Sequence, residues 1–282
     1  MIDDMFSTDV ELLRTEIETL WLPDERGRLL RVRSRTFRAA PELVLAVGAD
    51  GGQCLAFGID VPDLVAHELE AVVSRAAAAA DRAEPPSSLT RCMELLEDAV
   101  GPVVLSSGLS YAIPPGVTFS STAAIIRSDG AELSSLGGRA PSSADWDDDE
   151  WRMLLDGVLG PWAMARIEGR IVSICHCARL ADKGAEAGVW TDPDFRGQGH
   201  AAAVVAAWAS LLAPTGRHLF YSTFRENRSS QRVAARLGLR RIGCLWEIFR
   251  QPATNHPVRR MEDRPTRSAD ALTPASGSKP RQ

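Results

Sequence analysis

The sequence predicts a mixed α/β fold. Short strand-like runs alternate with helical patterns along most of the chain, as expected when helices cover a sheet. Two pairs of strand-like runs flank turn signals, ADGG at 49–52 and Glu168–Gly169, and this arrangement is typical of β-hairpins. With 282 residues, the chain is long enough for two domains that each bury a core.

Residues 1–105 are expected to form an N-terminal α/β accessory domain. Thr8 and Glu11 form a capping box signal at the start of a helix. Its apolar positions recur at helical spacing. Further strands are expected at 43–47 and 54–59, and helices from Asp63 into the alanine run at 76–80 and from near Ser88 to the terminator Gly101–Pro102. No catalytic motif occurs in this part of the sequence.

Residues 110–250 are expected to form a second domain with a larger sheet. Strands are expected at 123–127, 162–167, 170–178, 185–191 and 219–223, with a last strand at 241–249 that closes the sheet. Helices are expected through 151–154, from Gly199, and at 229–237 with Gly238 after the last turn. Residues 251–282 are polar, with almost no aliphatic side chains, and are expected to be disordered.

Composition narrows the class of protein. Hydrophobic residues make up 45% and charged residues 24% of the chain, and the net charge is −5. Such a charge gives no general attraction to nucleic acids or anionic membranes. The longest apolar stretch is shorter than the ~20 residues that span a bilayer, and the acidic first residues do not suggest a signal peptide. A cytoplasmic protein without nucleic acid or membrane partners is therefore expected.

The five cysteines do not suggest disulfides or a metal site. They are dispersed, and none forms a CxxC pair. Cys175, His176 and Cys177 are consecutive, but they lie in an alternating strand pattern that places the two thiols on one face and the imidazole on the other. Zinc sites need a second pair of ligands, and none follows. We expect reduced thiols and no bound metal.

The segment Thr191–Val204, TDPDFRGQGHAAAV, is the strongest motif. A strand, a glycine-rich turn and a helix start come together here, and such a helix N-terminus binds phosphate groups. A Walker A loop is excluded because no Gly-Lys-Ser/Thr follows. Gly197–Ala202 fits the GxGxxA dinucleotide fingerprint, but the acidic residue expected about 20 positions later comes a few residues late.

A second motif follows at a suitable distance. Asn227-Arg228-Ser229-Ser230 precedes a helix that ends in Leu237-Gly238-Leu239. Together with Arg196-Gly197-Gln198-Gly199-His200-Ala201, it resembles the two signatures of the GNAT superfamily of acetyl-CoA-dependent N-acetyltransferases, over residues 120–250. The resemblance implies a GNAT-like central mixed sheet with splayed strands.

The resemblance also implies a binding site for acetyl-CoA. Backbone groups of the strand would pair with the pantetheine arm and the acetyl carbonyl, N–H groups of the turn would hold the pyrophosphate, and Asn227 and Ser230 would contact the cofactor. The implied set is Val189, Trp190, Thr191, Arg196, Gly197, Gln198, Gly199, His200, Ala201, Ala202, Asn227 and Ser230. Arg228, Arg232, Arg236 and Arg240 form either a solvated face or a basic edge for the 3′-phosphate.

The catalytic groups are less clear from the sequence. Many similar enzymes carry a tyrosine seven residues after the motif asparagine, where this chain has Ala234. Tyr221, on the neighbouring strand, is the candidate acid, although a thiolate leaves easily without one. Glu186, near the start of the strand before the turn, is the candidate base, and His176 is an alternative.

The expected function is transfer of an acetyl group from acetyl-CoA to an amine of an unknown acceptor, with a small molecule favoured. A protein or peptide acetyltransferase is the first alternative, because the acidic loop 145–150 could line an open groove. A non-catalytic sensor that only binds acyl-CoA is the second, since the usual tyrosine is missing. A homodimer is left open.

Overall fold

A nine-stranded mixed sheet organises the computed structural model, which describes residues 7–34, 38–76, 85–130, 146 and 148–251. The strand order is β4-β3-β11-β5-β10-β9-β8-β7-β6, and a separate two-stranded sheet pairs β1 with β2. The described residues all belong to one compact unit, Met1–Gln251. Its strands are β1 (Trp21–Pro23), β2 (Leu29–Val32), β3 (Leu43–Gly48), β4 (Gln53–Phe57), β5 (Val103–Ala112), β6 (Ala124–Arg127), β7 (Trp162–Ile167), β8 (Arg170–Leu180), β9 (Gly184–Thr191), β10 (His218–Phe224) and β11 (Arg240–Arg250).

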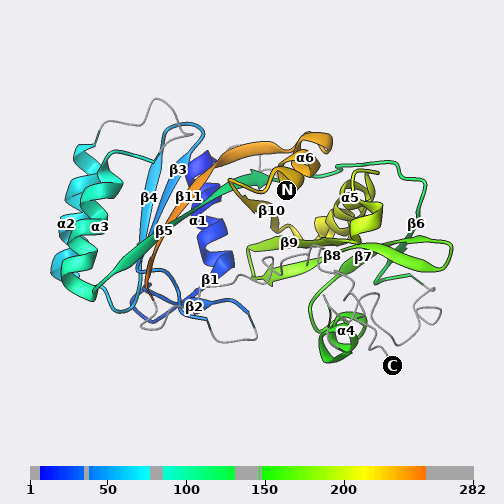
Figure 1. Cartoon of the computed structure of the whole chain (residues 1–282), viewed down its shortest axis with the longest axis horizontal. Helices are drawn as coiled ribbons and strands as arrows, with labels where there is room; N and C mark the ends of the chain where they lie inside the picture. Colours follow the sequence, from blue (N-terminus) through cyan, green and yellow to red (C-terminus); the bar gives the residue numbers. More distant parts are fainter. Residues whose placement is uncertain (1–6, 35–37, 77–84, 131–145, 147, 252–282) are drawn as a thin grey trace, which may run out of the picture. The chain divides into compact units, whose positions relative to one another are not determined.

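Helices lie on both faces of the large sheet (Figure 1). Side chains alternate between the faces along each strand. On one face, α2 and α3 pack against β3, β5 and β11, and α5 packs against β7, β8 and β9. On the other face lie α1 and α4. The helices are α1 (Asp9–Leu20), α2 (Asp63–Arg75), α3 (Ser88–Val100), α4 (Asp148–Leu155), α5 (His200–Leu212) and α6 (Arg228–Arg236), with short 3₁₀ turns η3 (Pro193–Phe195) and η4 (Ala213–Thr215).

The expected mixed α/β fold is confirmed, and most expected elements form within a few residues of their expected bounds. The capping box of α1 is present: the Thr8 hydroxyl accepts from the Glu11 N–H, and the Glu11 carboxylate accepts from the Thr8 N–H. Gly238 follows α6 with a φ of 63°, as its position after the last turn predicts. The expected continuation of α2 into 77–80 and the polar segment 252–282 lie outside the described residues.

Strand β5 is absent from the sequence-based description. It lies in the middle of the sheet, where it pairs antiparallel with β10 on one side and with β11 on the other. The last strand, β11, therefore does not lie beside β10 and does not close the sheet, because it is held between β5 and β3. The boundary expected between 105 and 110 falls inside β5, and the division into two domains stays a prediction.

Strands β9 and β10 form a parallel pair, and they part halfway along their length. Their pairing covers His218 with Gly184, Leu219 with Ala185, and Phe220 with Glu186. Beyond Glu186, β9 continues to Thr191 paired only with β8, while β10 continues to Phe224 paired only with β5. This is the splayed pair of strands that the resemblance implies, and Glu186 is the last residue of β9 before they separate.

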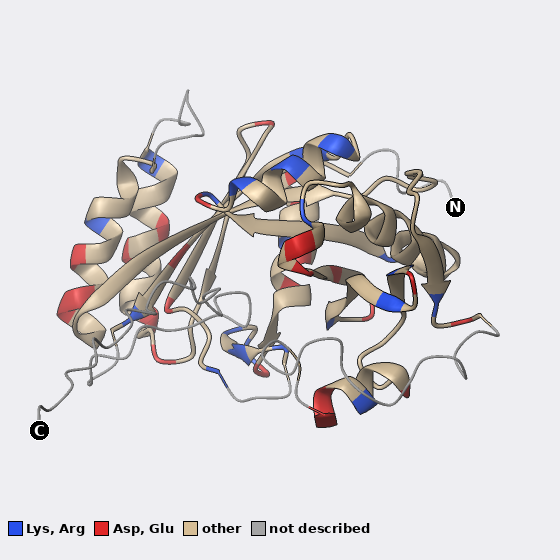
Figure 2. Ribbon diagram, turned by 45° about the vertical axis from the view of Figure 1, so that its right-hand side comes forward, with Lys and Arg blue, Asp and Glu red and all other residues tan. Residues whose placement is uncertain are grey.

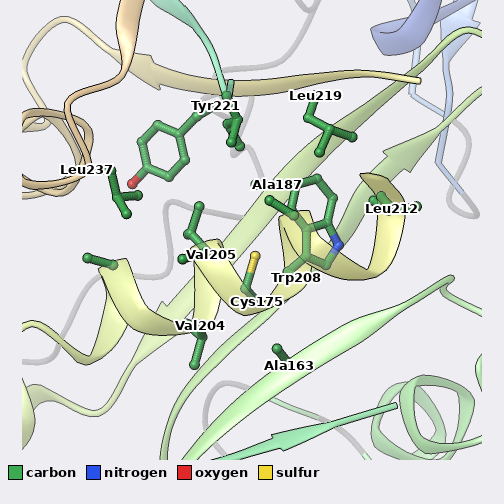
Figure 3. Packing of buried hydrophobic residues seen from close by; sticks show 14 of the residues in the cluster. Ala163, Cys175, Ala187, Val204, Val205, Trp208, Leu212, Leu219, Tyr221 and Leu237 are labelled. Atoms are coloured by element: carbon green, nitrogen blue, oxygen red, sulfur yellow. The ribbon is translucent and has the colours of Figure 1, made fainter. Parts of the chain in front are cut away.

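The core beside this parting is built around α5. Its sequence, HAAAVVAAWASLL, places small side chains against the sheet and one large ring, Trp208, which is fully buried. Figure 3 shows Trp208 with Cys175, Val205 and Tyr221 between α5 and the strands. Because alanine adds little bulk, α5 can approach the strands closely. The close packing fixes where the helix begins, and that end carries the glycine-rich turn.

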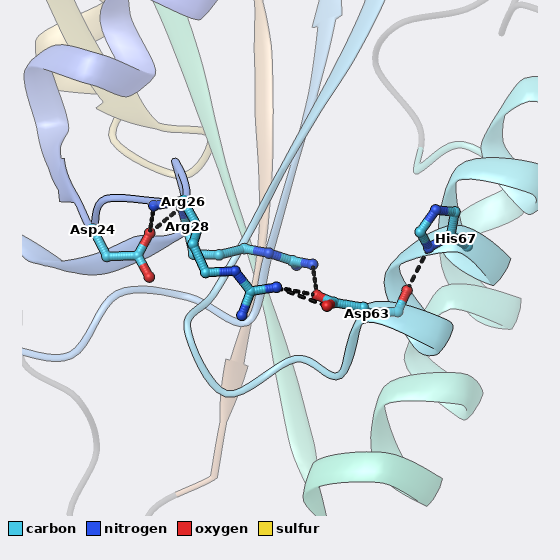
Figure 4. Close-up of polar contacts among 5 residues, drawn as sticks. All are labelled: Asp24, Arg26, Arg28, Asp63 and His67. Carbon is cyan, nitrogen blue, oxygen red and sulfur yellow. Dashed lines mark hydrogen bonds and ion pairs between the residues drawn. The ribbon is translucent and has the colours of Figure 1, made fainter.

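A set of exposed ion pairs links the β1–β2 connection to α2 (Figure 4). The guanidinium groups of Arg26 and Arg28 donate to the Asp63 carboxylate at 2.7 Å and 2.8 Å. The hydrogen bond and charge of Arg26 lower the pKa of Asp63. Exposed pairs of this kind contribute little to folding free energy. They orient the connection without carrying the fold.

Candidate active site

The glycine-rich turn leads from β9 into α5. Gly197 and Gly199 have φ values of 81° and 93°, in the left-handed region that favours glycine. In the part of the chain that the structure describes, the N–H groups from Gly197 to Ala202 have no acceptor. These six donors surround the positive end of the α5 dipole. The turn therefore has the chemistry of a phosphate-binding site, as the sequence predicts.

Two arginines hold the turn. Asp192 is buried and caps η3 by accepting from the Asp194 N–H at 3.0 Å. Arg170 donates to Asp192 at 2.6 Å and stacks over the Phe195 ring at 5.3 Å. From α6, Arg236 donates to the Gly197 carbonyl oxygen at 2.8 Å. The turn is thus fixed by the protein itself, which reduces the entropy lost when an anion binds.

The side chains of the predicted turn residues have different surroundings. Arg196 is exposed and donates through Nε to the Thr191 carbonyl oxygen at 3.4 Å. His200 is buried, with Nδ1 at 3.0 Å from the Ser121 hydroxyl and Nε2 at 3.3 Å from Gln198 Oε1. Burial lowers the pKa of this histidine. The imidazole therefore anchors the turn, and the residue's predicted contribution to binding is its N–H group.

The predicted strand residues lie where β9 no longer pairs with β10. Val189 belongs to this stretch. The Ser173 hydroxyl lies 2.9 Å from the Trp190 carbonyl oxygen, to which it can donate, and 2.8 Å from the Thr191 hydroxyl. Arg196 holds the Thr191 carbonyl oxygen. The carbonyl oxygens of two of the three predicted strand residues, Trp190 and Thr191, are therefore already in contact with the protein.

The second motif forms the start of α6. Asn227 is its N-cap residue, and its side-chain oxygen accepts from the Ser230 N–H at 3.0 Å. The motif thus has a clear structural role, and the predicted contact of both residues with the cofactor stays a prediction. The arginines of α6 give it a basic surface (Figure 2). Arg236 contacts the turn, and Arg240, just beyond the helix, pairs with Asp9 of α1.

A cluster of buried carboxyl groups lies under α1, at the point where β9 and β10 part. Glu186 of β9 pairs with Arg179 of β8 at 3.1 Å. The Ser222 hydroxyl of β10 lies 2.7 Å from Glu186 and 2.9 Å from Glu16 of α1. Glu247 of β11 is buried on the same face. Three carboxyl groups from distant parts of the chain, the predicted base among them, therefore come together here.

Glu16 has the most perturbed environment of this cluster. Its side chain is fully buried. Burial, together with the negative charges of Glu186 and Glu247, raises its pKa to about 8. Hydrogen bonding by Ser110 and Ser222 acts in the opposite direction. The sequence-based description missed this residue. A signal was present, because Glu16 falls on the apolar face of α1 defined by Leu13, Ile17 and Leu20.

The other two candidates for proton transfer lie away from this cluster. Tyr221 points to the α5 face of the sheet, with its ring beside Leu237 (Figure 3). Ala234 is buried in the same core. His176 is packed against the Trp146 ring, with centroids 5.5 Å apart, and desolvation lowers its pKa to about 4. This imidazole is neutral at physiological pH.

Comparison with known proteins identifies the domain. Residues 136–240 match the family described as acetyltransferase (GNAT) domain. This part of the chain is therefore similar to GNAT acetyltransferase domains, which supports an acyltransferase with acetyl-CoA as its cosubstrate. A search of curated proteins finds no match.

The solved structures that match this chain have low sequence identity to it. A GNAT-family protein of Novosphingobium aromaticivorans is 20% identical, with 52% of this chain and 66% of that chain covered, just under two thirds, and a TM-score of 0.39. An acetyltransferase of the GNAT family from Colwellia psychrerythraea is 17% identical, with 72% and 80% covered and a TM-score of 0.41. A Salmonella typhimurium protein solved with its cofactor acetyl-CoA is 15% identical, with 49% and 98% covered and a TM-score of 0.34.

Within the described ranges, no helix has the length and apolar character needed to cross a membrane. The same residues contain no group of three or more His, Cys, Asp or Glu side chains arranged to hold a metal ion.

Replacing Gly199 by alanine should weaken acetyl-CoA binding at least tenfold. A Cβ there would lie 3.1 Å from Phe119, on a backbone with φ of 93°. Gly216→Ala is the matched control, because its φ is 67° but no atom lies within 4 Å of the added Cβ. Both variants should lose stability by roughly 1–2 kcal/mol. Only the first should lose affinity in calorimetric titration, and equal affinities would contradict the assignment of the turn.

Glu16→Gln should change how stability depends on pH. In the wild type the pKa rises from 4.5 to about 8 on folding, so the folded state retains a proton that the unfolded state loses. Wild-type stability therefore falls between about pH 4.5 and 8, by up to about 1.4 kcal/mol per unit, and levels off above. The variant lacks this fall. Urea denaturation across pH measures it, with Glu18→Gln on the exposed side of α1 as control; parallel profiles would refute the perturbed pKa.

Proposed function

We propose that the protein transfers the acetyl group of acetyl-CoA to an amine of a small molecule, with Glu186 as the base that removes a proton from the acceptor. The observation that carries this proposal is the position of Glu186 as the last paired residue of β9 before β9 and β10 part. The six N–H donors of the turn and the start of α5 support binding of the cofactor phosphates. The parting of the strands is where the thioester would enter the sheet.

Chemistry favours a carboxylate at this place. An alkylammonium group with a pKa of ~10.4 needs roughly 4 kcal/mol to lose its proton at neutral pH. A carboxylate first attracts the ammonium group and then accepts its proton. The neutral nitrogen attacks the thioester carbon, the carbon–sulfur bond breaks, and the thiolate leaves with the bonding electron pair. Arg179, paired with Glu186 at 3.1 Å, orients this carboxylate in the resting enzyme.

The surroundings of Glu186 favour a small acceptor. Its side chain is only 9% exposed, and it lies between α1 and the sheet beside Glu16 and Glu247. Several carboxyl groups in one buried cluster attract a cation and disfavour an anionic acceptor. A long, flexible peptide would have to reach this depth with a single extended amine. Peptides are therefore the alternative acceptors to test beside small amines.

Glu186→Gln should lower turnover about 10²-fold or more at neutral pH, and less at high pH, where free amine is abundant. Release of the coenzyme A thiol from acetyl-CoA, measured over a panel of small amines and peptides, gives both the acceptor class and the rate. Glu18→Gln, an exposed carboxylate on α1, is the control and should keep wild-type turnover. A loss that does not depend on pH, or no loss, would argue against a base at position 186.

Tyr221→Phe should cost less than about tenfold in kcat, below the 10² to 10⁴ of a required general acid. The thiolate is a good leaving group, because a thiol with a pKa of ~8.5 is partly ionised near neutral pH. The ring of Tyr221 is buried in the α5 core, so phenylalanine preserves its packing. A loss greater than a hundredfold with unchanged acetyl-CoA affinity would assign the acid role to Tyr221.

A further inference from the structure

One hydroxyl group connects two carboxyl groups in the buried cluster. Ser222 Oγ lies 2.9 Å from Glu16 Oε1 and 2.7 Å from Glu186 Oε1. Both distances are those of O–H···O hydrogen bonds. The three residues come from α1, β10 and β9, and Glu16 is 206 positions from Ser222 in the sequence. The contact therefore exists only in the folded chain.

A serine hydroxyl has a single proton and can donate only one of these two bonds. The second bond needs a proton on one of the carboxyl groups. Glu186 also accepts a hydrogen bond from the cationic guanidinium group of Arg179. Glu16 has no such cation among its described contacts, and its other oxygen, Oε2, is buried without a hydrogen-bond partner in the described residues. The extra proton therefore belongs on Glu16, which donates to Ser222.

We propose that Glu16 is a positioning residue for Glu186. Glu16 stays protonated and donates a hydrogen bond to Ser222, so that the single hydroxyl proton of Ser222 is left to form the hydrogen bond to the Glu186 carboxylate. This inference rests on the proposed role of Glu186 as the base. Glu186 is then fixed by two donors, Ser222 at one oxygen and Arg179 at the other. A carboxylate held in this way is oriented before the acceptor arrives.

The groups that face Glu16 support a protonated state. Ser110 of β5 and Ser222 of β10 are polar and uncharged, while Glu186 of β9 and Glu247 of β11 carry negative charge. Arg179 of β8 pairs with Glu186. The apolar side chains Val44 and Ala46 of β3 complete the wall against α1. Burial and these two carboxylates place the pKa of Glu16 at about 8.

Ionisation of Glu16 would change the behaviour of Glu186. Above about pH 8, two carboxylates would compete for the single proton of Ser222. Glu186 would then lose its committed donor, and its orientation would loosen. The rate should therefore show an inflection near this pH that belongs to Glu16 and not to the acceptor.

Infrared spectroscopy of the ligand-free protein tests the proton directly. A protonated buried carboxyl group has a C=O stretching band that a carboxylate lacks. We expect this band at pH 7 in the wild type, its loss above pH 9, and its absence in Glu16→Gln. Ser222→Ala should shift the band, and Glu186→Gln should move its disappearance to lower pH, because the negative charge of Glu186 that raises the pKa of Glu16 is then removed. An unchanged band in Glu16→Gln, or none in the wild type, would overturn the proposal.

The pH profile of kcat tests the positioning role. The wild type should show the inflection near pH 8, and Glu16→Gln should not. Glu16→Ala should lower kcat about tenfold relative to Glu16→Gln, because the glutamine amide can still donate to Ser222. Equal losses in both variants, or an inflection that persists in them, would exclude the role. If Glu186→Gln keeps full turnover while the infrared band behaves as expected, the base assignment fails and the shared hydrogen bond stands.

Discussion

The separation of β9 from β10 is the constraint on which the site depends. A sheet normally satisfies the backbone groups of neighbouring strands over their whole length. Here the parallel pairing ends after Glu186. Beyond it, each strand remains paired only with its outer neighbour, β9 with β8 and β10 with β5. The open stretch exists because both strands are held firmly on their outer sides. The turn before α5 and the carboxyl cluster take their places from this opening.

The two faces of the opening have different chemistry. The α5 face offers N–H donors, the positive end of a helix and the arginines of α6. The α1 face offers carboxyl groups, of which Glu186 is the nearest to the opening. An anionic donor and a cationic acceptor would therefore approach from opposite sides of the sheet and meet between the strands.

Local patterns made much of this predictable from the sequence. The capping box of α1, the two hairpins and the glycine-rich turn depend on residues within a few positions of one another, and they formed as expected. Strand β5 was missed because Ser106, Ser107, Gly108 and Ser110 interrupt any apolar alternation. The bond from Ser222 to Glu16 joins residues that are 206 positions apart, and no local pattern carries that information. The sequence-based description missed Glu16, although its carboxyl group falls on the apolar face of α1.

The place of β5 between β10 and β11 has a consequence for how the chain must be made. During synthesis β3 and β5 emerge early, yet the strand that fills the space between them, β11, ends at Arg250. Until then both strands have an open edge, and open edges pair readily with other chains. Contacts between such distant segments also form slowly. The position between β3 and β5 is therefore the last in the sheet to be filled. A ribosome that pauses before residue 240 would hold an aggregation-prone intermediate.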